Sequence, residues 1–556
     1  MIFGPYNLRY YPSNIRNIAI KGCREKTSYS ESRFHDLFDY QPGPDRNEAV
    51  NLAGMTVKMD DIEDIWNEKI ISGFDSESIN LAHRFHWLIE EIASNASFSD
   101  LKRFYKMVIN WHKIVHSRED SIAFSPYNVS ERICNLTVFA CIAFKHNCLY
   151  LEDYKTIKSF IQEDLLRLKD ALEYPASGQV NNHILNNARA LYIGGAFLNS
   201  SHSMRIARSI FERHLPEMIS ENGYLNESSS HYQFLLTKNI QEVSIFAKAC
   251  DDSHFHKFIK RFSESMLEAS KRLIPSDLFK INDIPKIGDV SPDIPIDWFE
   301  LNSSGQQGTW NKLWNKSFEP KTSIPEILHL DGWIAARKYD WFLLAHSHPS
   351  KELYPLAHGH RDFGSFVLYD KGLPIFTDIG RGTYDNPTDN KNIGYESSAH
   401  STVMINNREP LFTSDIFKTI FPPDSKCHSK EFRLMDECRF EWSVSEDDFI
   451  WNRTILMEDQ GRIKIADSFQ AKRIDGYLYF SEGISIEDFT EDKIQIRLIG
   501  GSKYLISLKN IDSFEIDDAE DFTSYGKRSH IKRLRWIKEI KEKKEETELM
   551  IERLTN

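Results

Sequence analysis

The hydrophobic pattern changes its period once along this chain, and that change constrains the fold more than any other feature. From about Met59 to Arg272, apolar residues recur at i, i+3, i+4 and i+7, as in INLAHRFHWLIEEIA and SDLKRFYKMVINWHKIVH, which predicts amphipathic helices. Beyond a polar stretch rich in Gly and Ser at residues 301–323, the period falls to two, as in SFVLYDKGLPIFTD, which predicts strands. We therefore expect an all-α region followed by an antiparallel β-sandwich.

The length of the chain predicts more than one domain. With 556 residues it is too long for a single ordinary core. We interpret residues 1–50, which are rich in Tyr, Pro, Arg and Ser, as an irregular arm. Residues 51–315 then form a helical domain, in which short helices and short loops predict a bundle or toroid. Residues 316–556 form the β-sandwich domain.

Composition excludes some classes of partner. The net charge of −13 gives no global basic footprint for nucleic acid. Seven cysteines without a CxxC pair argue against a disulfide scaffold and favour a reducing compartment. Apolar runs of about 18 residues do not occur, so we expect no membrane span. The first residues also lack an apolar segment of signal-peptide length, which favours the cytoplasm; a periplasmic location is the alternative if a leader was removed.

Residues that carry chemistry are densest in one stretch, LAHGHRDFGSFVLYDKGLPIFTDIGRGTYDN, which is followed by YESSAHSTVM. Alternate residues of a strand share a face, so His358 and His360 can point the same way. The two imidazoles and one carboxylate of His360, Asp378 and His400 suit a metal ion, and zinc accepts this donor set without cysteine. His358 is then left for chemistry. The alternative is a hydrogen-bonded polar cluster of ordinary sheet residues.

The order HGHxD, DxGxxxY and AHxTV, preceded by NNHILNNARALYIGGAFL and NGYLNESSSHYQF, resembles the heparinase II/III-like polysaccharide lyases. This family includes heparin and heparan sulfate lyases and oligo-alginate lyases. The resemblance extends from about Trp66 to the C-terminus. It implies an α/α toroid followed by an antiparallel β-sandwich, and cleavage of a uronic-acid-containing glycan by β-elimination. The implied partner is an anionic polysaccharide or oligosaccharide, and formation of a homo-oligomer stays open.

The resemblance also implies catalytic residues. The elimination needs donors that neutralise the uronate carboxylate, and an acid and a base at the scissile bond. Asn182 and His183 are expected to neutralise the carboxylate at a helix N-terminus, with Asn181 as the N-cap. Tyr232 is expected to act as acid and base, and His358 as a second acid/base group or a carboxylate ligand. A metal at the neighbouring histidines would be structural and would hold the strands that present His358.

Further residues are expected to complete the site. Tyr384 is the candidate for a second catalytic Tyr, and Tyr395 is its reserve in the substrate-binding set. Tyr127 is expected to stack on a sugar, and Arg132 to pair with a carboxylate or sulfate. Glu227, which belongs to the segment that carries Tyr232, completes the substrate-binding set. The alternatives are packing aromatic residues and, for the arginine, a surface ion pair.

Two other functions stay open. A glycoside hydrolase would need two carboxylic acids across the scissile bond, and most acids within the motifs have other assigned roles. A non-catalytic glycan-binding protein on the same fold would be expected to have lost Asn182, Tyr232 or His358. All three are present, which favours an enzyme.

Overall fold

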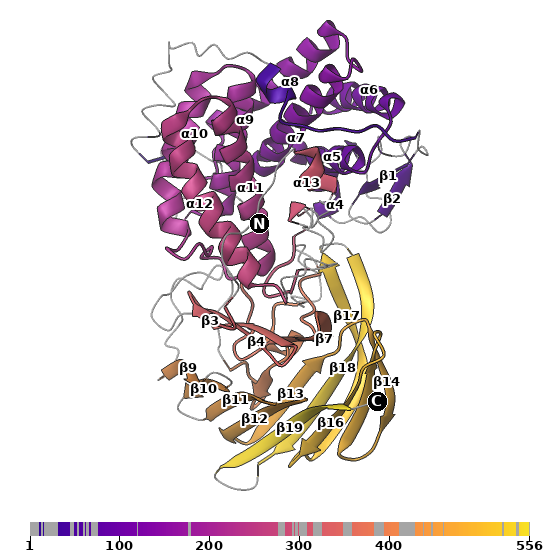
Figure 1. Ribbon diagram of the computed structural model, residues 1–556, viewed down its shortest axis with the longest axis vertical. Helices are drawn as coiled ribbons and strands as arrows, with labels where there is room; N and C mark the ends of the chain where they lie inside the picture. Colours follow the sequence, from indigo (N-terminus) through magenta and orange to yellow (C-terminus); the bar gives the residue numbers. More distant parts are fainter. Residues whose placement is uncertain are drawn as a thin grey trace.

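The structure, a computed structural model, combines a helical part with a part built of β-sheets (Figure 1). The prediction of an all-α region followed by antiparallel sheets is confirmed. The residues that the structure describes are 11–12, 15, 32–44, 49–52, 55–58, 62, 66–67, 76–118, 121–175, 180–275, 284–291, 294, 298–299, 309–314, 325–347, 358–382, 394–410, 429–436, 439–445, 449–459, 461–524, 527–540 and 544–554.

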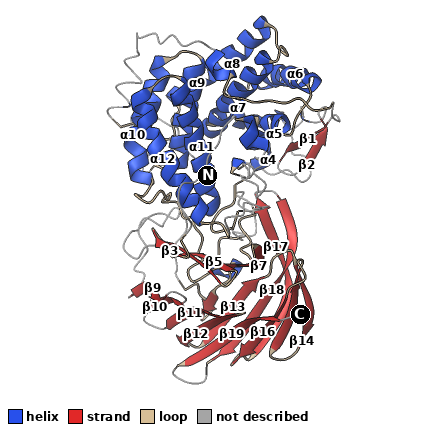
Figure 2. Cartoon of the chain, viewed as in Figure 1, coloured by secondary structure: helices blue, strands red, loops and turns tan. Residues whose placement is uncertain are grey.

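Helices make up most of the first part, which is blue in Figure 2. Their starts follow local rules. Helix α6 begins at a capping box, in which the Ser97 side chain accepts the Asp100 N–H and the Asp100 carboxylate accepts the Ser97 N–H. The helical segments are α2 Ser32–His35, α4 Ser76–Arg84, α5 His86–Ala93, α6 Phe98–Val115, η2 Ile122–Phe124, α7 Pro126–Lys145, α8 Leu151–Asp170, α9 Asn182–Phe197, α10 Ser201–Met218, α11 Ser230–Ala249, α12 Ser253–Arg272, α13 Thr309–Leu313 and η4 Ser397–Ala399.

Helices α7, α9 and α11 form the centre of the helical part. Every residue of α9 except His183 is buried, as expected of a helix that is covered on all sides. The Arg189 guanidinium on α9 links the three helices, because Nη1 lies 2.7 Å from Glu131 Oε1 on α7 and Nε lies 2.5 Å from Glu242 Oε2 on α11. Paired charges of this kind can be buried, whereas an unpaired one could not. The first residues of α9 are thereby held at a fixed place.

The second part consists of strands that pair antiparallel. Strands β14-β15-β16-β19-β12-β11-β10-β9 form an eight-stranded sheet, β17-β18-β13-β8 a four-stranded sheet, and β3-β4-β5-β6-β7 a five-stranded sheet; β1 and β2 pair in the helical part. The strands are β1 Ala49–Leu52, β2 Met55–Lys58, β3 Ile327–Leu330, β4 Trp333–Lys338, β5 Trp341–His346, β6 Val367–Asp370, β7 Leu373–Phe376, β8 Val403–Ile405, β9 Ser429–Asp436, β10 Arg439–Ser445, β11 Ile450–Asp459, β12 Arg462–Gln470, β13 Arg473–Tyr479, β14 Ile484–Phe489, β15 Lys493–Leu498, β16 Lys503–Lys509, β17 Ser513–Ser524, β18 Lys527–Glu539 and β19 Glu545–Leu554.

The sheets share one apolar core. Burial alternates along β12 and β16, which is the period-two pattern of strands with one covered face. Ile334 of the five-stranded sheet, Trp442 of the eight-stranded sheet and Leu534 of the four-stranded sheet belong to the same buried cluster. The loops at the edges of this sandwich are therefore carried on a rigid base.

One buried arginine fixes the two loops that carry the predicted metal ligands. Arg453 on β11 donates from Nε to Asp467 Oδ1 at 2.8 Å. Its Nη1 donates to the carbonyl oxygens of Gly364 at 3.0 Å and Ser401 at 2.8 Å. Because Gly364 follows the HGHRD segment and Ser401 follows His400, both loops are tied to the same strand.

Residues 284–291 connect the helical part to the β-sheet part. The Ser230 N–H donates to the Ile287 carbonyl at 3.0 Å, and the Asp289 N–H donates to the His358 carbonyl at 2.8 Å. Gly288 lies between them with φ +72°, and a Cβ there would lie only 2.5 Å from the His358 carbonyl oxygen. Glycine is therefore required at this close approach.

The predicted domain limits can be compared only in part. The expected boundary at 315/316 falls on residues outside the described part, between the end of α13 at Leu313 and the start of β3 at Ile327. Within the expected arm, the described residues include helix α2 and the first residues of β1. Among the described helices, none has the length and apolarity needed to cross a bilayer.

Candidate active site

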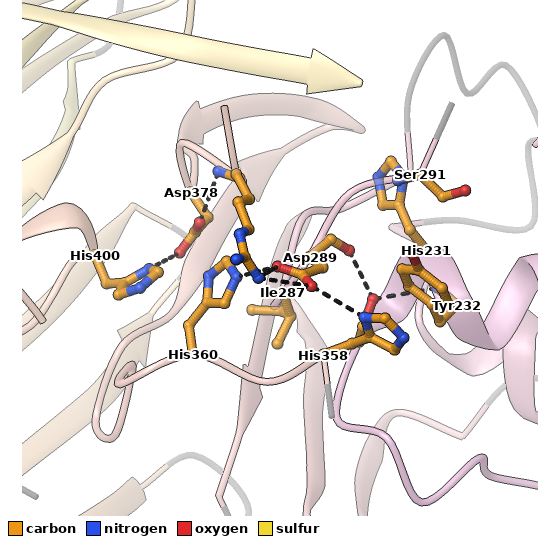
Figure 3. Close-up of polar contacts among 12 residues, drawn as sticks. His231, Tyr232, Ile287, Asp289, Ser291, His358, His360, Asp378 and His400 are labelled. Carbon is orange, nitrogen blue, oxygen red and sulfur yellow. Dashed lines mark hydrogen bonds and ion pairs between the residues drawn. The ribbon is translucent and has the colours of Figure 1, made fainter. Parts of the chain in front are cut away.

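The predicted catalytic residues that the structure describes, Asn182, His183, Tyr232 and His358, gather where the two parts meet. Asn182 begins α9 and Tyr232 lies in the first turn of α11, whereas His358 comes from the loop that precedes β6. Figure 3 shows Tyr232 beside His358, with Asp289 of the connecting segment next to both. His358 lies 176 residues from Asn182 in sequence, yet the two side chains are in contact.

Asn181 and Asn182, at the N-terminus of α9, have different hydrogen-bond partners. Asn181 is the N-cap, because its side-chain oxygen accepts the His183 N–H at 3.1 Å. Asn182 is held by Glu227 instead: its main-chain N–H lies 2.7 Å from Oε1 and its side-chain Nδ2 lies 2.8 Å from Oε2. The prediction that Asn181 is the N-cap is therefore confirmed, and the role of Asn182 as a ligand of the uronate carboxylate stays a prediction.

The Asn182 amide determines the protonation of His358. Both oxygens of the buried Glu227 accept from Asn182, so the atom that faces Glu227 is the donating nitrogen Nδ2. The second hydrogen of Nδ2 is directed to His358 Nε2 at 2.9 Å, so Nε2 has to accept. His358 Nδ1, which lies 3.0 Å from Asp289 Oδ2, then carries the ring proton. This hydrogen-bond pattern leaves the lone pair of the ring at Nε2.

Asp289 is the anionic centre of the cluster. Asp289 Oδ2 lies 3.0 Å from His358 Nδ1, and Asp289 Oδ1 lies 2.8 Å from His360 Nε2. Arg381 Nη1 lies 3.2 Å from both carboxylate oxygens. Burial by itself would raise the pKa of Asp289, but the Arg381 guanidinium and the two imidazoles hold that pKa well below its usual range. The carboxylate is a fixed negative charge that orients both imidazole rings.

Tyr232 and His358 are packed as a unit. Ser229 is the N-cap of α11: its Oγ accepts the Tyr232 N–H at 3.2 Å and donates to the Asp289 carbonyl at 2.7 Å. The Tyr232 ring lies flat on the His358 ring, with centroids 3.5 Å apart and planes inclined by 10°. The phenol and the imidazole therefore occupy fixed relative positions across the junction.

His183 lies at the same helix end and is paired with a carboxylate. Its Nδ1 lies 2.9 Å from Glu173 Oε1. Burial by itself would lower the pKa of His183, but the Glu173 carboxylate outweighs it and raises that pKa above the ordinary value. The centroids of the Tyr127 and His183 rings are 4.8 Å apart. The Arg84 guanidinium lies over the Tyr127 ring, 4.7 Å from its centroid. An anion at the α9 N-terminus would meet the helix dipole and an imidazolium together.

His360, Asp378 and His400 come together as predicted, fully buried, with one potential ligand atom each within 4.8 Å of the others. His400 Nδ1 lies 2.6 Å from Asp378 Oδ2, and His360 Nε2 is bound to Asp289. Among the described residues, the other ring nitrogens, His360 Nδ1 and His400 Nε2, have no hydrogen-bond partner. A buried ring nitrogen without a hydrogen-bond partner on each histidine fits metal ligation, and Asp378 would join as a ligand by exchanging its contact with His400 Nδ1 for the ion.

The electrostatics of this cluster favour a positive charge. Burial by itself would lower the pKa of His400, but the Asp378 carboxylate raises it to about 9. Asp378 is in turn held by the Gly380 N–H, which donates to Oδ1 at 2.9 Å. These residues fit a divalent cation, while nothing in the donor set identifies it as zinc.

Two substrate-binding predictions require correction. Arg132 is fully buried, and its guanidinium is used by Asp164, at 2.8 and 3.0 Å, and by the carbonyl oxygens of His83 and Ala123. It joins α7 to α8 and cannot reach a ligand. Glu227 is likewise buried, with both oxygens occupied by Asn182 as described above, so it positions that amide.

The two remaining tyrosines differ in how they can be placed. Tyr384 lies outside the described residues. Tyr395 is buried, with its ring 5.6 Å from the His360 ring and 5.1 Å from the Arg361 guanidinium. It packs behind the Asp289 cluster and does not line an open surface. Of the predicted substrate residues, Tyr127 is the one that lies beside His183.

Three residues of this site were missed from the sequence. Asp289 lies in the connecting segment KIGDVSP, outside every motif that we recognised. Arg381 follows Asp378 directly in DIGRG, so its nearness to the cluster could have been inferred. Glu173, which holds His183, lies between two helices, and an acid ten residues before a histidine gives no pattern.

Comparison with known proteins supports the resemblance seen in the motifs. Residues 328–487 match the family described as Heparinase II/III-like, C-terminal. A heparinase III structure is similar with a TM-score of 0.63 and 12% identity, over 94% of this chain and 88% of that chain. A heparinase III gene product has a TM-score of 0.58 and 14% identity, over 92% of this chain and 87% of that chain. A mutant of the heparan sulfate lyase HepC from Pedobacter heparinus has a TM-score of 0.51 and 14% identity, over 100% of this chain and 86% of that chain. No curated protein matches.

Proposed function

Because this chain carries a heparinase II/III-like C-terminal domain on a heparinase-like fold, we propose that it is a polysaccharide lyase that cleaves a uronic-acid-containing glycan by β-elimination. The observation that carries the proposal is the contact of Asn182 with His358, stacked on Tyr232, across the junction of the two parts. It gathers a carboxylate ligand and two proton-transfer groups at one place.

The proposed reaction begins with binding of the uronate carboxylate at the α9 N-terminus. Asn182 Nδ2 and the His183 imidazolium donate to the carboxylate and draw charge from the sugar C5, which makes the C5–H bond acidic enough to break. A protein base takes the C5 proton, the electron pair forms the C4–C5 double bond, and the C4–O bond to the leaving sugar breaks. A protein acid gives a proton to the departing oxygen.

The hydrogen bonds support a division of these roles between His358 and Tyr232. In the free protein one Nδ2 hydrogen of Asn182 is directed to the His358 Nε2 lone pair. A substrate carboxylate that takes this hydrogen would release the lone pair, so His358 becomes able to accept a proton when the substrate is in place. Tyr232, whose ring lies on His358, would exchange its hydroxyl proton with the reacting sugar, most simply with the departing oxygen.

Elimination suits this site better than hydrolysis. A glycoside hydrolase needs two carboxyl groups beside the bond, one as an acid and one as a base or nucleophile. Glu227 is 4% exposed and Asp289 is 0% exposed. Their oxygens accept hydrogen bonds from Asn182, His358 and His360. Neither carboxylate is placed to meet a sugar.

We propose that His360, Asp378 and His400 hold a divalent metal ion in a structural role, and zinc is the ion we would test first. When bound there, the ion would supply a positive charge that ties the loop before β6 to the loop before β8. The chain's own residues would still do the chemistry: His360 holds Asp289, and Asp289 keeps the His358 proton on Nδ1. Metal loading would thus affect stability first and catalysis through position.

A substrate screen tests the proposal. Heparan sulfate, chondroitin sulfate, alginate and their short oligosaccharides would each be incubated with the protein, and the ultraviolet absorbance of a conjugated unsaturated uronate would be followed. Tyr232→Phe serves as the inactive control. A rise with at least one uronate glycan that is absent from the control is expected. Release of new reducing ends without absorbance would contradict the proposal.

A further inference from the structure

A second group of potential metal ligands lies on the helical part, away from the candidate active site. His112 is in the last turn of α6, His116 is the C-cap residue one turn later, and Glu163 is on α8. Helices α6 and α8 contribute no residue to the clusters described above. Because residues four apart on a helix share a face, both imidazoles turn toward α8.

Both imidazoles lie close to the same oxygen of the Glu163 carboxylate. His112 Nε2 lies 3.2 Å and His116 Nδ1 lies 3.6 Å from Glu163 Oε2, and all three potential ligand atoms lie within 4.8 Å of one another. Ligands at about 2.1 Å from a tetrahedral ion are separated by about 3.4 Å. The two nitrogen–oxygen separations bracket this value, and a turn of the exposed His116 ring out of its stack on His112 would complete the site.

The cluster is ordered by packing and still open to solvent. The His112 ring lies on the Phe160 ring of α8, with centroids 3.7 Å apart and planes inclined by 8°. The His116 ring stacks on the His112 ring, with centroids 4.5 Å apart. The side chain of His112 is 21% exposed, that of His116 52% and that of Glu163 44%. A hydrated ion can therefore reach all three side chains.

We propose that His112, His116 and Glu163 form a binding site for a divalent first-row transition-metal ion such as Zn²⁺. Two imidazoles and one carboxylate are a donor set that these ions accept, and the open side leaves a fourth position for water. The ion joins the end of α6 to the middle of α8. This site is independent of the proposed lyase activity, because it shares no residue with that machinery.

Zinc titration of metal-free protein tests the site. Protein dialysed against a chelator would be titrated with ZnCl₂ by calorimetry, and bound zinc would be counted by elemental analysis after equilibrium dialysis. We expect His116→Ala to bind one equivalent fewer than the wild-type protein. Glu163→Gln should weaken that same equivalent at least tenfold, since even residues outside the ligand shell have effects of about 10- to 100-fold.

Two controls make the count specific. His254→Ala removes an exposed histidine of α12 and should leave the number of bound ions unchanged. His400→Ala should remove a different equivalent, so that the His116→Ala/His400→Ala double variant loses both. If His116→Ala and Glu163→Gln bind as much zinc as the wild-type protein with the same affinity, the proposal is overturned and the three residues are a surface cluster of two imidazoles and one carboxylate.

Discussion

Asn182 and His358 come from the two different parts of the chain and meet through a 2.9 Å contact between Nδ2 and Nε2. Each side chain therefore has a hydrogen-bond partner from the other part of the chain. Glu227 aims the amide and Asp289 fixes the imidazole proton. The proposed activity therefore depends on the packing of the helical part against the sheets as much as on the catalytic side chains.

Removal of the Tyr232 hydroxyl should slow the proposed proton transfer to the departing oxygen without unfolding the protein. We expect Tyr232→Phe to lower kcat by at least about a hundredfold, the low end of general acid–base contributions. The phenyl ring keeps the stacking on His358, so the melting temperature should change little. Tyr105→Phe, which removes a hydroxyl from α6, is the matched control and should keep full turnover. Near-normal kcat in Tyr232→Phe would move proton transfer to another group.

Glu227 should act only through Asn182. We expect Asn182→Ala to lower kcat by about 10²- to 10³-fold, as for loss of one donor to a developing charge. Glu227→Gln should have a smaller effect, because the amide loses one acceptor and Asn182 is aimed less well. The double variant should be no worse than Asn182→Ala, since coupled residues are not additive. Additive losses would show that Glu227 acts independently of Asn182.

Much of this arrangement could be predicted from the sequence, and the reasons for the failures are physical. Tyr232 and His358 could be found because they lie in short motifs, and the two periods of apolar residues gave the order of the parts. Asp289 could not be found, because its role comes from contacts 69 and 71 residues away in sequence. Arg132 was misassigned because a helix pattern does not show that Asp164, 32 residues on, takes its guanidinium.

The pH dependence of the reaction should report the charge of His183. Its pKa is raised by Glu173 against the effect of burial, so the imidazolium is present below that raised pKa and is lost as the pH rises through it. We expect kcat/KM to fall on the alkaline side for this reason. In Glu173→Gln the partner charge is gone, and the alkaline limb should move to lower pH.

A second histidine–glutamate pair, His214 and Glu217, supplies the control for this pH profile. Glu217 lies 2.7 Å from His214 on α10, so Glu217→Gln removes a similar imidazole–carboxylate contact outside the site. Its profile should match that of the wild-type protein. An alkaline limb that stays in place in Glu173→Gln would show that His183 does not carry the charge that the reaction needs.

Metal removal should lower stability before it affects chemistry. His360 and His400 each have a buried ring nitrogen with no hydrogen-bond partner among the described residues, so an ion there would link two loops. A chelator should lower the melting temperature of the wild-type protein by several degrees. His400→Ala should start from a lower melting temperature and a lower metal content, and chelation should not lower it further at this site. Full activity and unchanged melting of chelated protein, with no metal found, would reduce the cluster to hydrogen-bonded residues.

The fate of solvent oxygen tests β-elimination most directly. The protein would be incubated in water enriched in oxygen-18 with the glycan that gives the fastest turnover, and the shortest products would be analysed by mass spectrometry and ultraviolet absorbance. Elimination forms a C4–C5 double bond and adds no water, so we expect an absorbing product without the heavy isotope. A product that has gained one heavy oxygen and lacks the double bond would show hydrolysis and contradict the proposed function.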